Sequence, residues 1–284
     1  MQHGPTNENR ESTPSAAVAI PMMKPGRLAW RPRALMISHL AAAVLLVTWL
    51  VQPMRGCWDA ADLQVFRWLN NSLAVGYWWQ LIWAVANWRG FDLVAGSCIV
   101  MLLAYSIKTS PQRSLLAGWI SVALLALAAL AVKVVVEGLV VRGGLMYHRA
   151  SPTVALNGSF LMSELVPWIK AKERSPWSFP SDHGAVLLAV MFYLWYGGRR
   201  TIAVAGTLLA VVFSLPRLVS GGHWMTDIVV GSSAMALLTT AWVMATPLHD
   251  FIVYRACRIG KRLLPTSRPD AVDDRQRDEF RRAA

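Results

Sequence analysis

The stretch Arg217-Leu-Val-Ser-Gly-Gly-His223-Trp-Met-Thr-Asp227 sets three polar side chains beside two long apolar stretches, Ile202 to Leu215 and Trp224 to Ala245. His223 and Asp227 are four residues apart, so on a helix they lie on one face and the carboxylate can hold the imidazole in one tautomer. Arg217 can reach the same point from a preceding loop. Ionisable residues next to apolar sequence are costly, so we interpret this stretch as a candidate site.

Apolar sequence of this kind recurs along the chain. The composition is 55% hydrophobic and 15% charged with a positive mean hydropathy, which is typical of membrane proteins. Some stretches are shorter than the roughly 20 residues of a membrane span, so they must borrow flanking residues. We expect an all-α integral membrane protein with six spans: Ala34 to Gln52, Leu93 to Ile107, Leu115 to Val141, Gly184 to Tyr196, Ile202 to Leu215 and Trp224 to Ala245.

The distribution of Lys and Arg predicts how these spans are oriented. With a cytoplasmic N-terminus, 18 of the 28 Lys and Arg residues lie on the inner side. The net charge of +12 then indicates topology and contact with anionic lipid, and not nucleic-acid binding. We expect a disordered cytoplasmic arm at 1–33, a six-span catalytic domain at 34–248 and a basic cytoplasmic tail at 249–284. No Cys or His spacing typical of a metal site occurs, and we expect no metal and no cofactor.

With this topology, a second polar segment falls on the same outer side as the first. Phe179-Pro180-Ser181-Asp182-His183-Gly184 immediately precedes an apolar stretch, and a long connection from Arg142 to Pro180 leads into it. The first outer loop, Met54 to Asp92, is rich in Trp and Tyr, which suits a segment in the lipid headgroup layer. The two polar segments are therefore predicted to form one outward-facing site.

Two histidines and two arginines in such a site favour phosphoryl chemistry. A neutral His223 is a nitrogen nucleophile for phosphorus, and a protonated His183 can deliver a proton to the leaving oxygen. Arg217 and Arg149 suit the non-bridging oxygens of a phosphate. Ser181 and nearby backbone donors lie where a helix is expected to start, and a helix N-terminus attracts anions.

Structural explanations compete with this interpretation at several positions. Asp182 can be the N-cap of the span that follows it. Arg142 can mark only the interfacial end of the preceding span. Lys133 and Glu137 are four residues apart inside that span, where an ion pair reduces the cost of a buried charge.

The two polar segments resemble motifs of the type 2 phosphatidic acid phosphatase (PAP2) superfamily. Its second and third motifs, Pro-Ser-Gly-His and Ser-Arg-x5-His-x3-Asp, stand here as Pro180-Ser181-Asp182-His183 and Pro216-Arg217-x5-His223-x3-Asp227. The first motif, Lys-x6-Arg-Pro, matches Arg142-x6-Arg149-Ala150, with Arg in place of Lys and Ala in place of Pro. The resemblance covers Ala34 to Leu248 and implies a helical bundle of the PAP2 and haloperoxidase type.

The resemblance also implies a role for each matching residue. His223 is the implied nucleophile, Asp227 orients it and His183 is the general acid. Arg149, Ser181 and Arg217 are implied phosphate ligands, with either Arg142 or Lys133 as the cation of the first motif. Asp182 and Glu164 are expected in the loop that contacts the substrate.

Shorter strings resemble one branch of the superfamily, whose members transfer a phosphoryl group from undecaprenyl diphosphate to the 1-phosphate of lipid A at the periplasmic face of the bacterial inner membrane. The resemblance implies these two lipids as substrates. Ser181 departs from the branch, where glycine is usual, and restores the general phosphatase pattern. The strings are Arg89-Gly-Phe91-Asp92, Arg149-Ala-Ser-Pro152-Thr153, Ser163-Glu164-Leu165, Asp182-His183-Gly184 and His223-Trp224-x-Thr226-Asp227-Ile228.

Three other functions remain open at this point. With water as acceptor the protein is a lipid phosphatase that releases phosphate from undecaprenyl diphosphate. A vanadium haloperoxidase has the same oxyanion pocket, although six spans and an aromatic outer loop favour a lipid substrate. A non-enzymatic anion or lipid transporter also fits charged residues among spans, although the two halves of the chain show no repeat. The sequence leaves the oligomeric state and regulation open.

Overall fold

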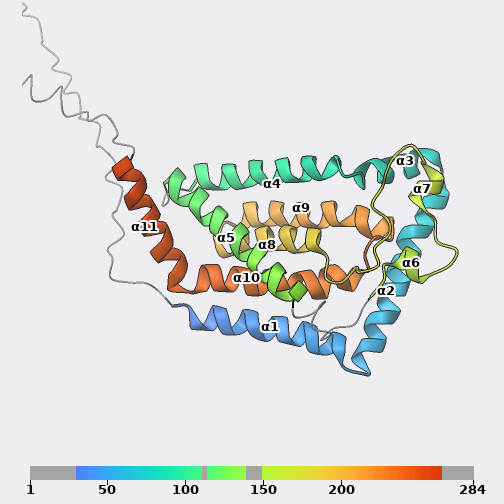
Figure 1. Ribbon diagram of the computed structural model, residues 1–284, viewed down its shortest axis with the longest axis horizontal. Helices are drawn as coiled ribbons and strands as arrows, with labels where there is room; N and C mark the ends of the chain where they lie inside the picture. The colour runs from blue at the N-terminus through green and yellow to red at the C-terminus, as the bar shows by residue number, and fades with distance from the viewer. Residues whose placement is uncertain (1–29, 111–113, 139–148, 264–284) are drawn as a thin grey trace, which may run out of the picture.

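The computed structural model describes residues 30–110, 114–138 and 149–263, and over these ranges it is all-α (Figure 1). Most of the long helices run side by side along the longest axis of the molecule, and α5 crosses them obliquely. These helices are α1 (Pro32–Leu50), α4 (Phe91–Lys108), α5 (Leu115–Val136), α8 (Asp182–Tyr196), α9 (Arg200–Val219) and α10 (Ser233–Ala245). A π-helical turn, η3 (Asp227–Ser232), leads directly into α10.

Five helices of the described residues are long and apolar enough to cross a membrane, and the chain is a multi-pass membrane protein. They are α1, α4, α5, α9 and the continuous segment Asp227–Ala245, and they coincide with five of the six predicted spans. The predicted span Gly184 to Tyr196 is α8, which has only 15 residues. The predicted stretch Leu115 to Val141 forms α5 as far as Val136, and residues 139–148 lie outside the described residues.

The helices differ in how deeply they are buried within the protein. The segment Asp227–Ala245 is 72% buried and α9 is 50% buried, whereas α4 and α5 are each 17% buried. Small residues allow the central helices to approach closely, because a Cβ at Gly206 of α9 would lie 2.7 Å from the Leu194 side chain of α8. The protein core therefore lies among α8, α9 and α10, and the apolar faces of α4 and α5 point outward.

One end of the bundle is covered by helices where the sequence predicted a loop from Met54 to Asp92 (Figure 1). The helices of this connection were not predicted, because its polar residues point inward: Asp62 and Asn70 are buried, while Trp68 and Trp78 are about three-quarters exposed. A window that looks for apolar length misses this inverted pattern. The covering elements from this segment are α2 (Met54–Asn71), η1 (Ser72–Val75) and α3 (Tyr77–Ala86), and the connection that leads to α8 adds α6 (Pro152–Ala155) and α7 (Met162–Leu165).

The opposite end of the bundle carries α11 (Pro247–Leu263), which begins close to the start of α1 (Figure 1). The Arg31 backbone N–H donates to the Ala245 carbonyl at 2.9 Å, and His249 Nε2 lies 2.9 Å from the Ser121 hydroxyl of α5. The sequence predicted only a basic tail here. The helix forms because this buried histidine and its apolar neighbours give α11 a face that packs on α5.

Candidate active site

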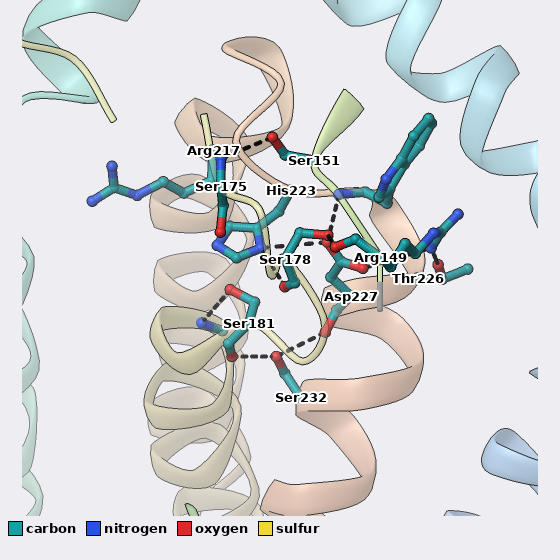
Figure 2. Close-up of polar contacts among 12 residues, drawn as sticks. Arg149, Ser151, Ser175, Ser178, Ser181, Arg217, His223, Thr226, Asp227 and Ser232 are labelled. Carbon is teal, nitrogen blue, oxygen red and sulfur yellow. Dashed lines mark hydrogen bonds and ion pairs between the residues drawn. The ribbon is translucent and has the colours of Figure 1, made fainter. Parts of the chain in front are cut away.

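His223 lies in the turn that joins α9 to η3, at the end covered by α2 and α3 (Figure 2). Its ring is buried, and Nδ1 lies 2.9 Å from the Ser178 carbonyl oxygen and 3.4 Å from Asp227 Oδ2. A carbonyl and a carboxylate only accept hydrogen bonds, so the proton of a neutral ring must be on Nδ1. Nε2 then carries the free lone pair.

Two glycines shape the turn that presents His223. Gly221 has φ +72°, and a Cβ there would lie 2.6 Å from the Thr153 side chain. A Cβ at Gly222 would lie 2.8 Å from the Lys172 carbonyl oxygen. The first glycine therefore satisfies a left-handed backbone, and the second lets the outer loop pack directly on the turn.

Asp227 is the first residue of η3 and is completely buried. Its Oδ2 accepts from the Trp224 backbone N–H at 2.8 Å, and its Oδ1 lies 3.6 Å from Arg149 Nη1. His223 precedes the helix, so the prediction that both residues share one helix face was wrong. The local turn still brings the carboxylate to the ring, because Asp227 caps the backbone of the residue after His223.

The start of α8 is tied to the start of η3 beneath the His223 ring (Figure 2). The Ser232 hydroxyl donates to the Ser181 carbonyl at 2.6 Å and lies 3.0 Å from the Asp227 carbonyl. The Ser181 backbone N–H donates to the same Asp227 carbonyl at 3.2 Å. π-Helical turns often occur at functional sites, and here the turn places its Ser232 hydroxyl between its own Asp227 carbonyl and the Ser181 carbonyl at the start of α8.

Ser181 is the N-cap of α8, and its hydroxyl accepts from the Gly184 backbone N–H at 3.3 Å. The alternative that Asp182 caps this helix was therefore wrong. Asp182 instead forms an ion pair with Lys133 of α5 at 2.7 Å. The predicted pair of Lys133 with Glu137 is confirmed at 3.4 Å, so this lysine joins two carboxylates.

His183 is the second residue of α8, and its Nε2 lies 3.2 Å from the Phe213 carbonyl oxygen of α9. Because a carbonyl only accepts, Nε2 carries a proton and Nδ1 is the atom left to exchange one. The ring also interacts electrostatically with Arg217, Asp92 and His223. The two histidines predicted from separate motifs thus belong to one charged environment.

Arg217 lies in the last turn of α9, not in a loop, and is almost completely buried. Its Nη1 donates to the Asn87 side-chain oxygen at 2.5 Å, and its Nη2 contacts both Asp92 carboxylate oxygens at 2.7 and 3.0 Å. We call Arg217, Asn87 and Asp92 the Arg217 cluster. These contacts use Nη1 and Nη2 of Arg217, so Nε is the guanidinium nitrogen that they do not occupy.

Arg149 lies on the other side of the site and contacts α2. Its Nη2 donates to Asp62 at 2.6 Å and to Asp59 at 3.4 Å, and its Nη1 donates to the Thr226 hydroxyl at 2.6 Å. We call Arg149, Asp59, Asp62 and Thr226 the Arg149 cluster. The Arg149 guanidinium also lies over the Trp224 ring, 4.7 Å from its centroid.

Asp62 is the centre of the Arg149 cluster, since its carboxylate also accepts from the Thr226 backbone N–H at 2.9 Å and from the Thr226 hydroxyl at 2.6 Å. Burial raises the pKa of Asp62, although Arg149 and the Thr226 hydrogen bonds oppose the shift. Thr226 directly precedes Asp227. The α2 carboxylate therefore holds the backbone that carries the Asp227 side chain.

Sequence reasoning missed Asp62, Asn87 and the Ser178 carbonyl as parts of the site. The polar residues of α2 and α3 were the signal for the first two, but their aromatic neighbours pointed to a lipid interface. A backbone carbonyl leaves no signal in side-chain identity. Of the other predicted residues, Glu164 is exposed in α7, and Arg142 lies outside the described residues.

Comparison with known proteins identifies the family. The PAP2 superfamily model matches residues 118–250, which include His183, Arg217, His223 and Asp227. Lipid A 1-diphosphate synthase of Escherichia coli (strain K12) is 29% identical over 223 residues, which are 77% of this chain and 90% of that protein. No solved structure matches the chain. The chain is a PAP2 superfamily enzyme, a member of a metal-independent family of phosphatases and phosphotransferases.

Proposed function

We propose that this protein transfers the terminal phosphoryl group of undecaprenyl diphosphate to the 1-phosphate of lipid A through a phosphohistidine at His223. The observation that carries the proposal is the orientation of the His223 ring, whose Nδ1 is held by the Ser178 carbonyl and Asp227 while Nε2 keeps its lone pair. The similarity to lipid A 1-diphosphate synthase supports lipid A as the acceptor, and the donor follows from the resemblance of the sequence motifs.

In the first half of the reaction, His223 Nε2 attacks the terminal phosphorus of the donor. The N–P bond forms as the P–O bond to the inner phosphate breaks. His183 delivers the proton on Nδ1 to the departing oxygen, so undecaprenyl monophosphate leaves protonated. The Nδ1–H of His223 remains bound to acceptors, and these stabilise the positive charge that develops on the attacking ring.

In the second half, an oxygen of the lipid A 1-phosphate attacks the phosphorus of the phosphohistidine. The N–P bond breaks and returns the lone pair to His223 Nε2, while the new P–O bond completes a diphosphate. His183, now neutral, regains a proton from the acceptor or from solvent. Because donor and acceptor react in turn, one phosphate pocket serves both half-reactions.

The proposed phosphate ligands are Arg217, the backbone donors near Ser181, and Arg149. Arg217 can offer Nε while Asn87 and Asp92 hold its two terminal nitrogens. Arg149 reaches a phosphate through Nε, since Asp62 and Thr226 occupy its other nitrogens. The cation of the first motif is proposed as Arg142 or Lys133, and Lys133 lies beside the residue preceding His183.

We also propose the membrane placement that this reaction needs. α8 acts as a sixth, short span, and the catalytic domain covers residues 34–248. The site faces the periplasm of a bacterial inner membrane and both termini face the cytoplasm. In support of this placement, the start of α1 and the helix α11 lie at the end of the bundle opposite α2 and α3 (Figure 1).

Hydrolysis is the second candidate, because Ser181 matches the general phosphatase motif and has a structural role as the α8 N-cap. A phosphatase shares the first half-reaction and differs only in using water as acceptor. Purified protein given undecaprenyl diphosphate labelled on the terminal phosphate, with and without lipid A, distinguishes the two. Transfer predicts labelled lipid A, whereas label recovered only as free phosphate would contradict it.

A further inference from the structure

A cleft of about 600 Å³ opens at the end of the bundle that carries His223. Its lining comes from two segments, one after α3 and one in the loop that leads to α8. Four of the seven lining residues are cationic, and none of the four has a role in the function proposed above. The lining residues are Trp88, Arg89, Lys170, Ala171, Lys172, Glu173 and Arg174.

The two segments of this basic cleft are bound to each other by their backbones. The Asn87 side-chain amide donates to the Lys172 carbonyl at 3.0 Å, and the Lys172 N–H donates to the Asn87 carbonyl at 3.3 Å. Trp88 and Ala171 form an antiparallel bridge. The positions of the cationic side chains are therefore set by an ordered framework and not by a loose surface loop.

The same framework connects the basic cleft to the catalytic residues. Asn87 is completely buried, and its side-chain oxygen accepts from Arg217 while its amide holds Lys172. The Lys172 carbonyl also packs against Gly222, the residue before His223. The cleft thus adjoins both the arginine and the turn that carries the proposed nucleophile.

The charge of the basic cleft is largely uncompensated. Its one acidic residue, Glu173, is buried, and its carboxylate accepts from the Ser163 backbone N–H at 3.2 and 3.4 Å. Within the part of the chain that the structure describes, no carboxylate lies within 4.0 Å of Arg89, Lys170, Lys172 or Arg174. An anion in the cleft would relieve this repulsion.

The crowding of positive charge is visible at Lys172. Partial burial and the neighbouring Arg217 lower the pKa of this amine, and Arg89 acts in the same direction. Asp182 and Asp92 oppose the shift. Lys172 is therefore a cation whose charge is favoured when an anion binds next to it.

We propose that the basic cleft is a second phosphate-binding site, which holds a phosphate of a lipid substrate other than the one that His223 attacks. The proposal rests on the proposed function in one respect: the first phosphate is the one that His223 attacks. Two substrates carry such a group: the donor diphosphate, through its inner phosphate, and a phosphorylated acceptor lipid. In both, one Lys or Arg on each segment clamps the phosphate oxygens.

The test removes one charge from each segment of the cleft. In a double variant, Arg89→Gln with Lys172→Gln, we expect the KM of the substrate that uses the cleft to rise on the order of tenfold, equivalent to about 1.4 kcal/mol, while kcat changes by less than about twofold. Arg67→Gln on α2 removes one charge at the same end outside the cleft and should leave both constants unchanged. Lys172→Arg keeps the charge and should preserve the KM.

Separate assays identify which substrate supplies the phosphate. If the donor uses the cleft, the double variant raises the concentration of undecaprenyl diphosphate at which phosphoenzyme formation, followed without acceptor, is half-maximal. If the acceptor uses it, the donor KM is unchanged and the KM for lipid A rises. The proposal is overturned if the double variant raises neither KM above the value for Arg67→Gln. It is also overturned if the double variant lowers kcat while both KM values stay constant.

Binding without turnover separates this proposal from the function on which it rests. In a His223→Ala background, undecaprenyl diphosphate, undecaprenyl monophosphate and undecaprenol in nanodiscs are titrated against protein with and without the two cleft substitutions. A donor that uses the cleft predicts that the substitutions weaken binding of the diphosphate and the monophosphate, which both carry the inner phosphate, and leave undecaprenol unchanged, whatever reaction the enzyme performs. For an acceptor that uses the cleft, lipid A and its fully dephosphorylated form replace the polyprenyl lipids. Equal binding of every phosphorylated lipid with and without the substitutions refutes the second site.

Discussion

The Arg149 and Arg217 clusters flank His223 and differ in how far they open to the outside. Each holds a buried arginine with a carboxylate from the first half of the chain. Asp62, the carboxylate nearest to Arg149, is 0% exposed, whereas Asp92, the carboxylate that binds Arg217, is 42% exposed; the more distant Asp59 forms the outer edge of the Arg149 cluster and is 48% exposed. We call the Arg149 cluster the closed one, because Asp62 joins Arg149 and Thr226 away from water, and the Arg217 cluster the open one, because Asp92 reaches water.

The physical reason for this difference is the cost of removing charge from water. In the Arg149 cluster, a buried guanidinium needs its carboxylate, because loss of one partner leaves the other uncompensated. In the Arg217 cluster, water reaches Asp92 and can stabilise its charge, while the buried Arg217 keeps the two Asn87 oxygens as partners. Substitutions that break each cluster should accordingly act on different measurable quantities.

The largest effect is expected from His223, which lies between the clusters and belongs to neither. His223→Ala should reduce phosphoryl transfer by on the order of 10⁴-fold, since the attacking nitrogen is lost. Both clusters remain intact, so the thermal unfolding temperature in detergent should stay close to that of the unaltered protein. An acid-labile phosphoenzyme formed from labelled donor should disappear. A variant that still transfers phosphate at the normal rate contradicts the phosphohistidine mechanism.

Breaking the closed cluster should act first on stability. Asp62→Ala leaves Arg149 buried without its main partner and removes two acceptors from Thr226, so we expect a loss of about 3 to 5 kcal/mol in the free energy of unfolding. Denaturant unfolding in mixed micelles measures it. Gln64→Ala, at an exposed position of the same helix, is the matched control. A loss below about 1 kcal/mol for Asp62→Ala would show that the cluster is open to water.

Breaking the open cluster should act on catalysis with little cost in stability. Asp92→Asn keeps an acceptor for Arg217 but removes the charge-assisted pair that orients it, so we expect kcat/KM to fall about tenfold. The free energy of unfolding should change by about 1 kcal/mol or less. If stability falls as far as in Asp62→Ala, the contrast between the two clusters does not hold.

The smallest effect concerns the pH dependence of substrate affinity on the open side. The pKa of Lys172 is lowered by partial burial and Arg217, so its positive charge is lost at a lower pH than that of an ordinary lysine. The KM of the substrate held in the basic cleft should therefore rise, by about threefold, over a pH range below the one around 10.4 in which an ordinary lysine loses its charge. Lys172→Arg stays charged and should show a flat profile over this range. Equal slopes for both proteins would exclude Lys172 as the titrating group.

The spans were predictable because the length of an apolar stretch is itself the physical requirement for crossing a bilayer. Five of the six predicted stretches correspond to span-length helices, with ends shifted by a few residues. α2 could not be found in this way, because its buried face is polar. Its Asp62 and Asn70 contact partners 87 and 149 positions away, and no local pattern encodes such contacts.

The candidate site was predictable where the chemistry depends on spacing within one segment. His223 and Asp227 meet within one turn, as their spacing indicates, although through a turn and not a helix face. The partners of Arg149 and Arg217 come from α2 and the start of α4, so tertiary packing alone decides which donors remain for a phosphate. The predicted roles of these residues remain predictions until the variants are measured.

The length of α8 sets the depth at which the chemistry takes place. Fifteen residues at 1.5 Å each extend about 22 Å, which is less than the hydrocarbon thickness of about 30 Å. If the end of α8 at Tyr196 reaches the inner boundary, His183 lies several ångströms below the outer one. A polyprenyl chain would then stay embedded among the acyl tails while its diphosphate bends inward to react. We expect the enzyme to work best in thin bilayers and to slow as the acyl chains lengthen.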